Sequence, residues 1–136
     1  MHELARIGVA IDADLLEKFD KHIAGRGYTN RSEAFRDLIR ESLIRESVAE
    51  PDADVVGALT LVYDHHVRQL SDRLNELQHD HHSQVVSTLH VHLDHHNCLE
   101  VLVLRGKAAE VQKIADKLIS IKGIQHGRLT LTTAGS

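Results

Sequence analysis

The chain has 136 residues, with 16 Lys and Arg against 20 Asp and Glu, which gives a formal net charge of -4. This length suits one domain or two very small ones, and the balance of 42% hydrophobic and 26% charged residues excludes a disordered chain. No apolar run approaches the roughly 20 residues that a membrane helix needs. The single cysteine excludes an internal disulfide and favours the reducing cytoplasm. The unusual feature is histidine: seven of the 12 lie between positions 79 and 96.

The only proline divides the chain. Pro51 lies in a short stretch of small and acidic residues, which is typical of a linker. We therefore predict a first domain over residues 1–48, a linker over 49–54 and a second domain over 55–136. The first piece alone buries too little surface to be a comfortable monomer, so it needs a partner.

One strand and two helices are predicted in the first domain. Residues 4–11 alternate with a period of two and one apolar face, which indicates a strand. Because a lone strand cannot pair its own backbone groups, this strand must pair with a second chain. Helical spacing then predicts a helix that begins after Asp12 and ends at Gly25 and Gly27, and a second helix that begins at Asn30.

The second domain is predicted to have the order βαββαβ, which is the ferredoxin-like arrangement and makes the whole chain an α+β protein. Its two helices cover one face of the sheet, so the other face is free to meet solvent or a second subunit. The predicted elements are a strand over 55–64, a helix over 65–80, strands over 85–94 and 98–104, a helix over 107–121 and a strand over 124–131.

A histidine pair and the cysteine meet on the predicted hairpin. His90 and His92 project from the same face because strand side chains alternate. If the turn takes up the three residues before Cys98, that cysteine lies opposite Asp94, and Glu100 lies opposite His92. Two imidazoles and a thiol are ligands for a late first-row metal, and the carboxylate is a hydrogen-bond acceptor that could support them.

The histidine-rich end of the preceding helix offers a fourth ligand. His90 lies on the order of 20 Å from the start of its strand, so His79 of the same chain does not reach it. In a two-fold assembly, His79 of another chain could complete the site. Three nitrogens and one sulfur suit Ni(II), Cu(II) or Zn(II), and spacing alone does not choose among them.

Ordinary roles also exist for these residues taken singly. A lone strand histidine is more often a surface residue than a ligand, and a lone cysteine is more often a small buried hydrophobe. The joint pattern favours metal binding. The other histidines near the hairpin are expected at the surface, with weak extra metal contacts left open; they are His65, His66, His95 and His96.

Two stretches resemble the nickel-responsive transcriptional regulators of bacteria and archaea. Residues 26–34, Arg-Gly-Tyr-Thr-Asn-Arg-Ser-Glu-Ala, are typical of ribbon-helix-helix repressors in general. Residues 88–92 and 98–100, with His79 upstream, are more specific to this family. The resemblance implies an N-terminal ribbon-helix-helix DNA-binding domain and a C-terminal ferredoxin-like metal domain, assembled as a homotetramer that is a dimer of dimers.

The resemblance also implies a metal and its ligands. Nickel is expected in a square plane of ligands from two subunits, with two further residues supporting them: the ligands are His90, His92 and Cys98 with His79 of another subunit, and the supporting residues are Gln78 and Glu100. Glu33 and Asp37 match positions that help to hold a cation between the domains. A helix capping box and an acidic pair one turn apart explain these two residues equally well.

The predicted ribbon has one strong candidate for base contact. In a ribbon-helix-helix dimer, two strands pair and enter the major groove of operator DNA. Arg6 can bind guanine bidentately, although an ordinary exposed cation is the alternative. Gly8 and Ala10 stand where the family has polar residues, so recognition is either relaxed or made through different base contacts. Phosphate contacts are expected from Asn30 and Arg31, and the resemblance implies further non-specific contacts from Arg36 and Arg68.

We therefore predict a nickel-responsive DNA-binding regulator that represses nickel uptake when Ni(II) occupies the inter-subunit site. One alternative is a DNA-binding regulator that responds to copper or to a small ligand. Another is a metalloenzyme that uses His90 and His92. Enzymes keep an open metal position, whereas four protein ligands would close this site, so we expect no enzymatic activity.

Overall fold

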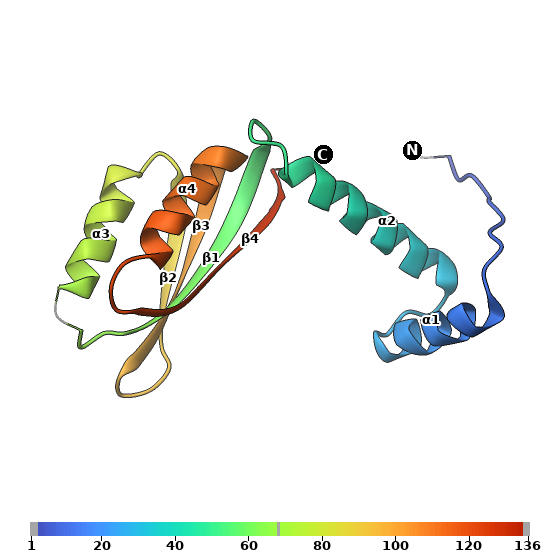
Figure 1. Cartoon of the computed structure of the whole chain (residues 1–136), viewed down its shortest axis with the longest axis horizontal. Helices are drawn as coiled ribbons and strands as arrows, with labels where there is room; N and C mark the ends of the chain where they lie inside the picture. The colour runs from blue at the N-terminus through green and yellow to red at the C-terminus, as the bar shows by residue number, and fades with distance from the viewer. Residues whose placement is uncertain (1–2, 68, 135–136) are drawn as a thin grey trace. The chain divides into compact units, whose positions relative to one another are not determined.

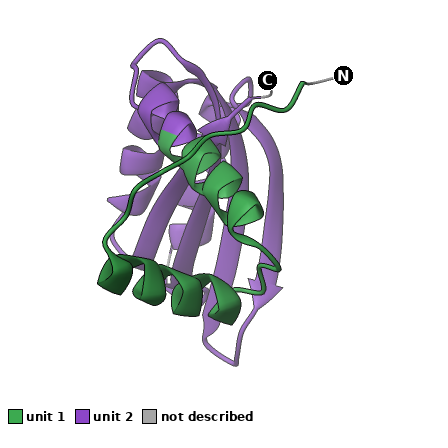
Figure 2. Ribbon diagram, turned by 90° about the vertical axis from the view of Figure 1, so that its right-hand side faces the viewer, with its two compact units in different colours: residues 1–42 green, residues 43–136 purple. Residues whose placement is uncertain are grey.

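The computed structural model describes residues 3–67 and 69–134 (Figure 1). The chain forms two compact units, residues 1–42 and residues 43–136 (Figure 2). The boundary between them falls within helix α2 (Arg31–Val48), before the stretch predicted as a linker. Among the described residues, no helix has the length and apolar composition needed to cross a membrane.

The first unit has two helices and an irregular N-terminal segment. Helix α1 spans Ala13–Gly25 and is followed by α2. The single chain does not form the strand predicted over residues 4–11, because a strand needs a neighbouring strand for its backbone hydrogen bonds. The apolar side chains of Ile7 and Val9 are 80% and 61% exposed, so nothing within this unit covers them.

The predicted end of α1 is confirmed. The amide of Tyr28 donates to the carbonyl of Ile23 at 3.1 Å, and the amide of Gly27 donates to that of Ala24 at 3.2 Å. This pair of bonds is a Schellman motif, which requires a left-handed residue after the helix. Gly27 provides it with a φ of +86°.

The two helix starts differ. At α2 the side-chain Oδ1 of Asn30 accepts a hydrogen bond from the amide of Glu33 at 2.9 Å, which confirms the predicted cap. At α1 the Asp12 side chain makes no capping bond, and only its carbonyl accepts, from the amide of Leu16.

The second unit is a four-stranded antiparallel sheet with the strand order β2-β3-β1-β4. This order and the alternation of strands and helices confirm the ferredoxin-like arrangement. The elements are β1 (Asp54–Asp64), α3 (Leu70–Asp80), β2 (Val85–His92), β3 (Asn97–Lys107), α4 (Ala108–Ile119) and β4 (Ile124–Thr133).

Helices α3 and α4 lie on the same side of this sheet and enclose the core (Figure 1). Each strand faces them with alternate residues, as the period of two predicts. Neither α3 nor α4 covers the other face, and β2 exposes Leu89 and Val91 there. The largest fully buried side chains of the core include Leu59, Leu61, Tyr63, Leu74, Leu102, Leu104 and Leu118.

The stretch predicted as a linker is fastened to the second unit. Residues 49–53 form a turn, and the first two amides of α4 donate to its carbonyls: Ala108 to Ala53 at 2.9 Å and Ala109 to Pro51 at 3.0 Å. The first amides of a helix lack partners inside it, so these bonds satisfy two of them. The turn therefore fixes where α4 begins.

Helix α3 begins later than predicted. The helix predicted from residue 65 starts at Leu70 instead. The cause is Asp64, whose Oδ1 accepts a hydrogen bond from the amide of His66 at 2.8 Å and turns the chain away from a helix. The same bond is the main reason why the pKa of the Asp64 carboxyl is lowered.

Gly127 on β4 lies so close to α4 that a side chain there would collide. A Cβ at this position would lie 2.6 Å from Cγ1 and 3.0 Å from Cγ2 of Ile119, and a β-branched side chain cannot easily rotate away. We expect Gly127→Ala to lower the free energy of unfolding by about 1–3 kcal/mol, measured by chemical denaturation.

The matched control is Gly8→Ala, because a Cβ at Gly8 meets nothing within 4 Å. It should leave the unfolding of the second unit unchanged. Equal losses from the two substitutions would contradict the close packing between β4 and α4.

Candidate metal centre

The turn of the β2–β3 hairpin is fixed by one side chain. Oδ1 of Asp94 accepts hydrogen bonds from the amide of His96 at 2.9 Å and the amide of Asn97 at 2.8 Å. The amide of Leu93 donates to the carbonyl of Asn97 at 2.9 Å and closes the turn. Asn97 therefore belongs to β3, whereas the sequence analysis placed it in the turn.

This turn gives a different register from the predicted one. Cys98 lies opposite His92 rather than Asp94, and Glu100 lies opposite His90 rather than His92. The correction is a shift by two residues, so the face that each side chain occupies does not change. It brings the cysteine and the carboxylate directly against the two histidines.

Cys98 and His90 approach each other on the helix-covered side of the sheet. The thiol sulfur Sγ of Cys98 lies 3.7 Å from Nδ1 of His90. Two ligands bound about 2.0 Å (nitrogen) and 2.3 Å (sulfur) from one ion can be at most about 4.3 Å apart, so this spacing fits a shared metal. Cys98 is only 2% exposed, whereas half of the His90 side chain is exposed, so the pair lies at the edge of the core.

Glu100 is a buried carboxylate behind this pair. It is 1% exposed; Oε2 accepts a hydrogen bond from Nε2 of Gln78 at 3.4 Å, and Oε1 lies against Nε2 of His90 with no hydrogen bond of good geometry. Burial raises the pKa of this carboxyl, while His90 and Gln78 act in the opposite direction. Since Nε2 of His90 faces the carboxylate, Nδ1 is left to face the thiol.

Tyr63 is a neighbour of the thiol that the sequence analysis did not identify. It lies opposite Cys98 in the β1–β3 pairing and is fully buried. Burial, and then the charges of Glu100 and Cys98, raise the pKa of the Tyr63 phenol, which keeps it neutral. The sequence placed Tyr63 in the predicted first strand of the domain, but the pairing of that strand with β3 was needed to find its partner.

The other two predicted ligands are not gathered with this pair in one chain. His92 is exposed, and its ring packs edge-on against that of His65, with 5.3 Å between ring centroids. His79 is exposed in the last turn of α3, where its ring lies beside that of His82. A single chain therefore brings Cys98 and His90 together and leaves the set of four incomplete.

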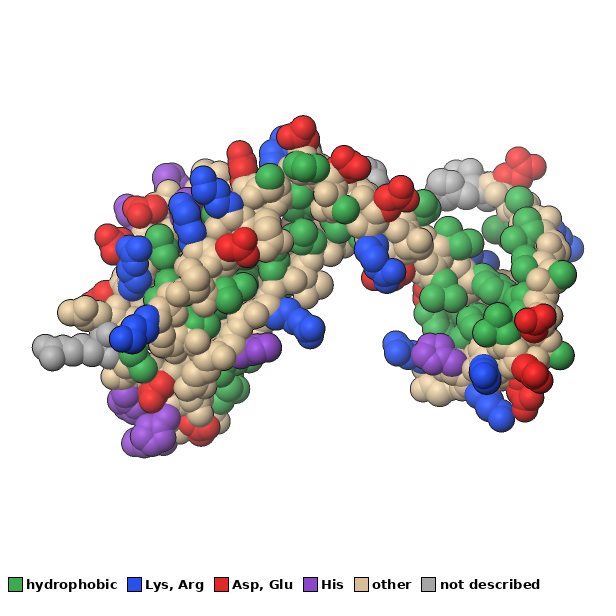
Figure 3. All heavy atoms as spheres, viewed as in Figure 1, with side chains coloured by type: hydrophobic (Ala, Val, Ile, Leu, Met, Phe, Trp, Pro, Cys, Tyr) green, Lys and Arg blue, Asp and Glu red, His purple; other side chains and the backbone are tan. Residues whose placement is uncertain are grey.

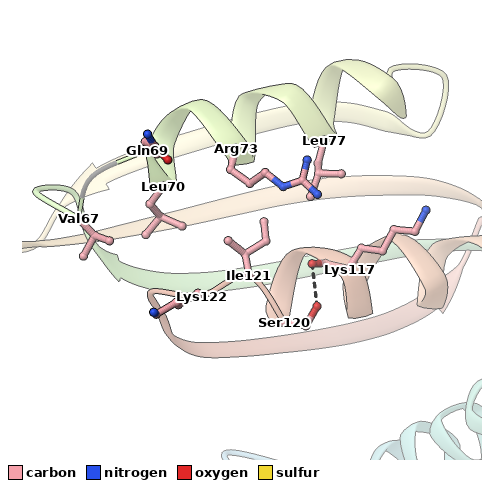
Figure 4. A pocket seen from close by; sticks show the side chains of 9 residues that line it. All are labelled: Val67, Gln69, Leu70, Arg73, Leu77, Lys117, Ser120, Ile121 and Lys122. Atoms are coloured by element: carbon pink, nitrogen blue, oxygen red, sulfur yellow. Dashed lines mark hydrogen bonds between the residues drawn. The ribbon is translucent and has the colours of Figure 1, made fainter.

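A groove of about 800 Å³ lies between α3 and α4 but contains none of these four residues (Figure 4). Its described lining combines apolar and cationic side chains and includes no histidine, cysteine or carboxylate, so it lacks the usual metal ligands. The apolar residues are Val67, Leu70, Leu77 and Ile121, and the cationic ones are Arg73, Lys117 and Lys122.

Comparison with known proteins covers both units. Residues 5–46 match the ribbon-helix-helix proteins of the copG family, and residues 56–132 match the NikR C-terminal nickel-binding domain. The chain is 64% identical to a nickel-responsive regulator of Solibacter usitatus, over all of this chain and 98% of that protein. This chain belongs to the nickel-responsive regulator family.

Other relatives with the same name agree. The identity is 62% to a protein of Geobacter sulfurreducens, over 99% of this chain and 97% of that protein. It is 54% to a protein of Nitratidesulfovibrio vulgaris, with the same coverage. The α+β fold class, with a ribbon-helix-helix part followed by a nickel-binding domain, is therefore confirmed.

In this family the N-terminal unit is the ribbon-helix-helix part. Arg6, Gly8 and Ala10 all lie in its exposed N-terminal segment. Arg36 is exposed on α2, and Arg68 lies outside the described residues. The predicted DNA contacts of this family member therefore have accessible side chains at Arg6 and Arg36.

Two of the predicted phosphate contacts already have partners within the unit. Arg31 donates to both carboxylate oxygens of Asp20, at 2.9 and 2.8 Å. The side-chain oxygen of Asn30 caps α2. Each would have to exchange a partner to reach a phosphate, and the same holds for the amide of Glu33 in the first turn of α2, which donates to Asn30.

The carboxylates predicted to hold an interdomain cation are also engaged locally. Asp37 accepts hydrogen bonds from the hydroxyl of Tyr28 at 2.7 Å and from Arg40 at 2.8 Å. Glu33 accepts one from Thr29 at 3.3 Å and donates its amide to Asn30. The side chain of Asn30 thus provides one of the two bonds of a capping box, and cation binding at Glu33 and Asp37 stays a prediction.

Proposed function

We propose that this chain is a nickel-responsive DNA-binding transcriptional regulator that represses nickel uptake when Ni(II) is bound between subunits. The ligands in this proposal are His90, His92 and Cys98 of one chain and His79 of another. The observation that carries it is the hairpin, which pairs Cys98 with His92 in the register and brings the Cys98 sulfur within 3.7 Å of a ring nitrogen of His90, in a chain whose relatives are named nickel-responsive regulators.

The residues present fit nickel in their chemistry. Imidazole nitrogens and a thiolate suit late first-row divalent ions, and the buried carboxylate of Glu100 can take the second ring N–H of His90. The bound cation would supply the positive charge that draws ligands of two chains together. Since Cys98 must lose its proton to bind, nickel affinity should fall in acid.

The proposed assembly is a homotetramer in which two kinds of exposed apolar surface are covered. Ile7 and Val9 of the N-terminal segment would pair with a second chain to form the ribbon. Leu89 and Val91, on the sheet face opposite α3 and α4, would pack against another metal-binding domain. Covering both surfaces would remove these apolar side chains from water.

Repression would follow from the way in which metal binding orders this assembly. A site that takes His79 from α3 of one chain and three ligands from the hairpin of another fixes the interface between two metal-binding domains. That interface would favour an arrangement of the two ribbons that reaches two operator half-sites. By linkage, operator DNA must tighten nickel binding by the same factor.

The test is a DNA titration at fixed salt, because salt alone changes such affinities. The probe is a duplex selected from a random pool by the nickel-loaded chain. We expect nickel to tighten its binding by at least about tenfold, which lies within the usual range of such couplings. Equal affinities with and without nickel would refute the proposal, and a response to copper alone would favour the alternative regulator.

A further inference from the structure

A second cluster of potential metal ligands lies where β1 ends and the hairpin turns. One ligand atom from each of Asp64, His66 and His96 lies within 4.8 Å of the others, and this is the only such group of three found among the described residues. Histidine side chains gather at this end of the second unit (Figure 3). None of the three belongs to the proposed nickel site.

The cluster is built from a repeated tripeptide. Asp-His-His occurs three times, at residues 64–66, 80–82 and 94–96. In the first and third copies, Oδ1 of the aspartate accepts a hydrogen bond from the amide two residues later, that of His66 at 2.8 Å and that of His96 at 2.9 Å. This bond fixes the backbone position of the last histidine in each turn, His66 or His96, and the two turns face each other.

The two turns are also bonded to each other. The amide of His65 donates to the carbonyl of His96 at 3.0 Å, and Nε2 of His65 lies 3.0 Å from the carbonyl oxygen of His95. Asp64 and Asn97 are paired residues of β1 and β3. The backbone that carries the three ligands is therefore held in place before any ion binds, which lowers the cost of binding.

We propose that Asp64, His66 and His96 bind a second divalent transition-metal ion in each chain. Two imidazole nitrogens and a carboxylate oxygen suit a late first-row ion. Nδ1 of His66 lies 3.4 Å from Oδ1 of Asp64, and the His66 and His96 ring centroids are 5.4 Å apart. Three protein ligands leave positions for water, so this site is weaker and exchanges faster than one closed by a thiolate.

The site stands apart from the proposed regulatory function but lies next to its ligands. His65, between Asp64 and His66 in the chain, packs its ring edge-on against that of His92. An ion in the second site would therefore hold the turn that supports a proposed nickel ligand. The binding of this ion requires neither DNA nor a second chain.

The test uses the full-length Cys98→Ala chain, in which the thiolate is absent, and Ni(II) alone as the probe. Equilibrium dialysis should still find one nickel per chain. Adding His96→Ala should weaken that binding at least about tenfold, since even a residue that only supports a ligand contributes on this scale. The matched control is His22→Ala, an exposed histidine of α1 outside the cluster, which should change nothing.

Carbethoxylation of histidines, read by mass spectrometry, shows which side chains hold the ion. Nickel should protect His66 and His96 from modification. His66→Gln keeps the backbone amide that bonds to Asp64 and should remove the protection of His96. Circular dichroism confirms that each variant is folded. Protection confined to His90 and His92, or nickel binding that is unchanged by His96→Ala, would overturn the proposal.

Discussion

Cys98→Ala is expected to abolish the thiolate-to-nickel charge-transfer absorption and to weaken the tightest nickel binding by more than about 100-fold. The reason is that Cys98 provides the only sulfur in the chain that can become a thiolate, and this sulfur lies 3.7 Å from a ring nitrogen of His90. The same variant should lose the nickel dependence of DNA binding. Absorption spectra and a nickel titration with a competing chelator measure the first two effects.

A loss of packing must be separated from a loss of the ligand, because Cys98 is part of the buried core. Val111→Ala is the matched control: it truncates a fully buried side chain on α4 in the same core. We expect this control to lower the melting temperature and to keep the charge-transfer band. If the band survived in Cys98→Ala, nickel would be bound by other residues and the proposed site would be wrong.

Local patterns were enough to predict most elements of the fold. Alternating apolar residues identify a strand and the face that its side chains occupy. Gly27 ends α1 through a left-handed turn. Each of these signals is contained within a few consecutive residues. The sheet order followed from the βαββαβ sequence of elements, because few topologies connect these elements without crossing connections. These predictions needed no knowledge of contacts between distant residues.

Aspartate side chains in turns account for the main differences. The predicted helix start at residue 65 ignored that Asp64 can take the amide of His66, and the predicted hairpin turn ignored that Asp94 can take those of His96 and Asn97. Such bonds compete with regular backbone pairing and are weakly encoded in a hydrophobic pattern. In the hairpin, one misplaced turn residue shifted every cross-strand pair by two positions.

The environment of the thiol depended on contacts that no short pattern specifies. Tyr63 meets Cys98 only because β1 pairs with β3, and Gln78 meets Glu100 only because α3 covers that strand. Strand alternation correctly put Cys98 and Glu100 on one face of the sheet, but it did not predict which face the helices cover. The structure shows that this is the covered face, which explains why a carboxylate is buried there.

A site shared between chains makes a quantitative prediction for mixed assemblies. His79→Ala and Cys98→Ala chains each lack one proposed ligand, so each alone should show no thiolate-to-nickel absorption from a complete site. When equal amounts are unfolded together and reassembled, a site is complete wherever a His79→Ala hairpin meets an α3 helix from a Cys98→Ala chain. Random pairing makes this about a quarter of all sites.

We therefore expect the mixed assembly to recover about a quarter of the absorption of the unaltered protein, with the remaining sites lacking at least one ligand. The control is a mixture of His90→Ala and Cys98→Ala chains, which should recover nothing because both residues belong to the same hairpin. If the first mixture recovered nothing while each chain still assembled, all four ligands would have to come from one chain, and metal binding could not order an interface between subunits.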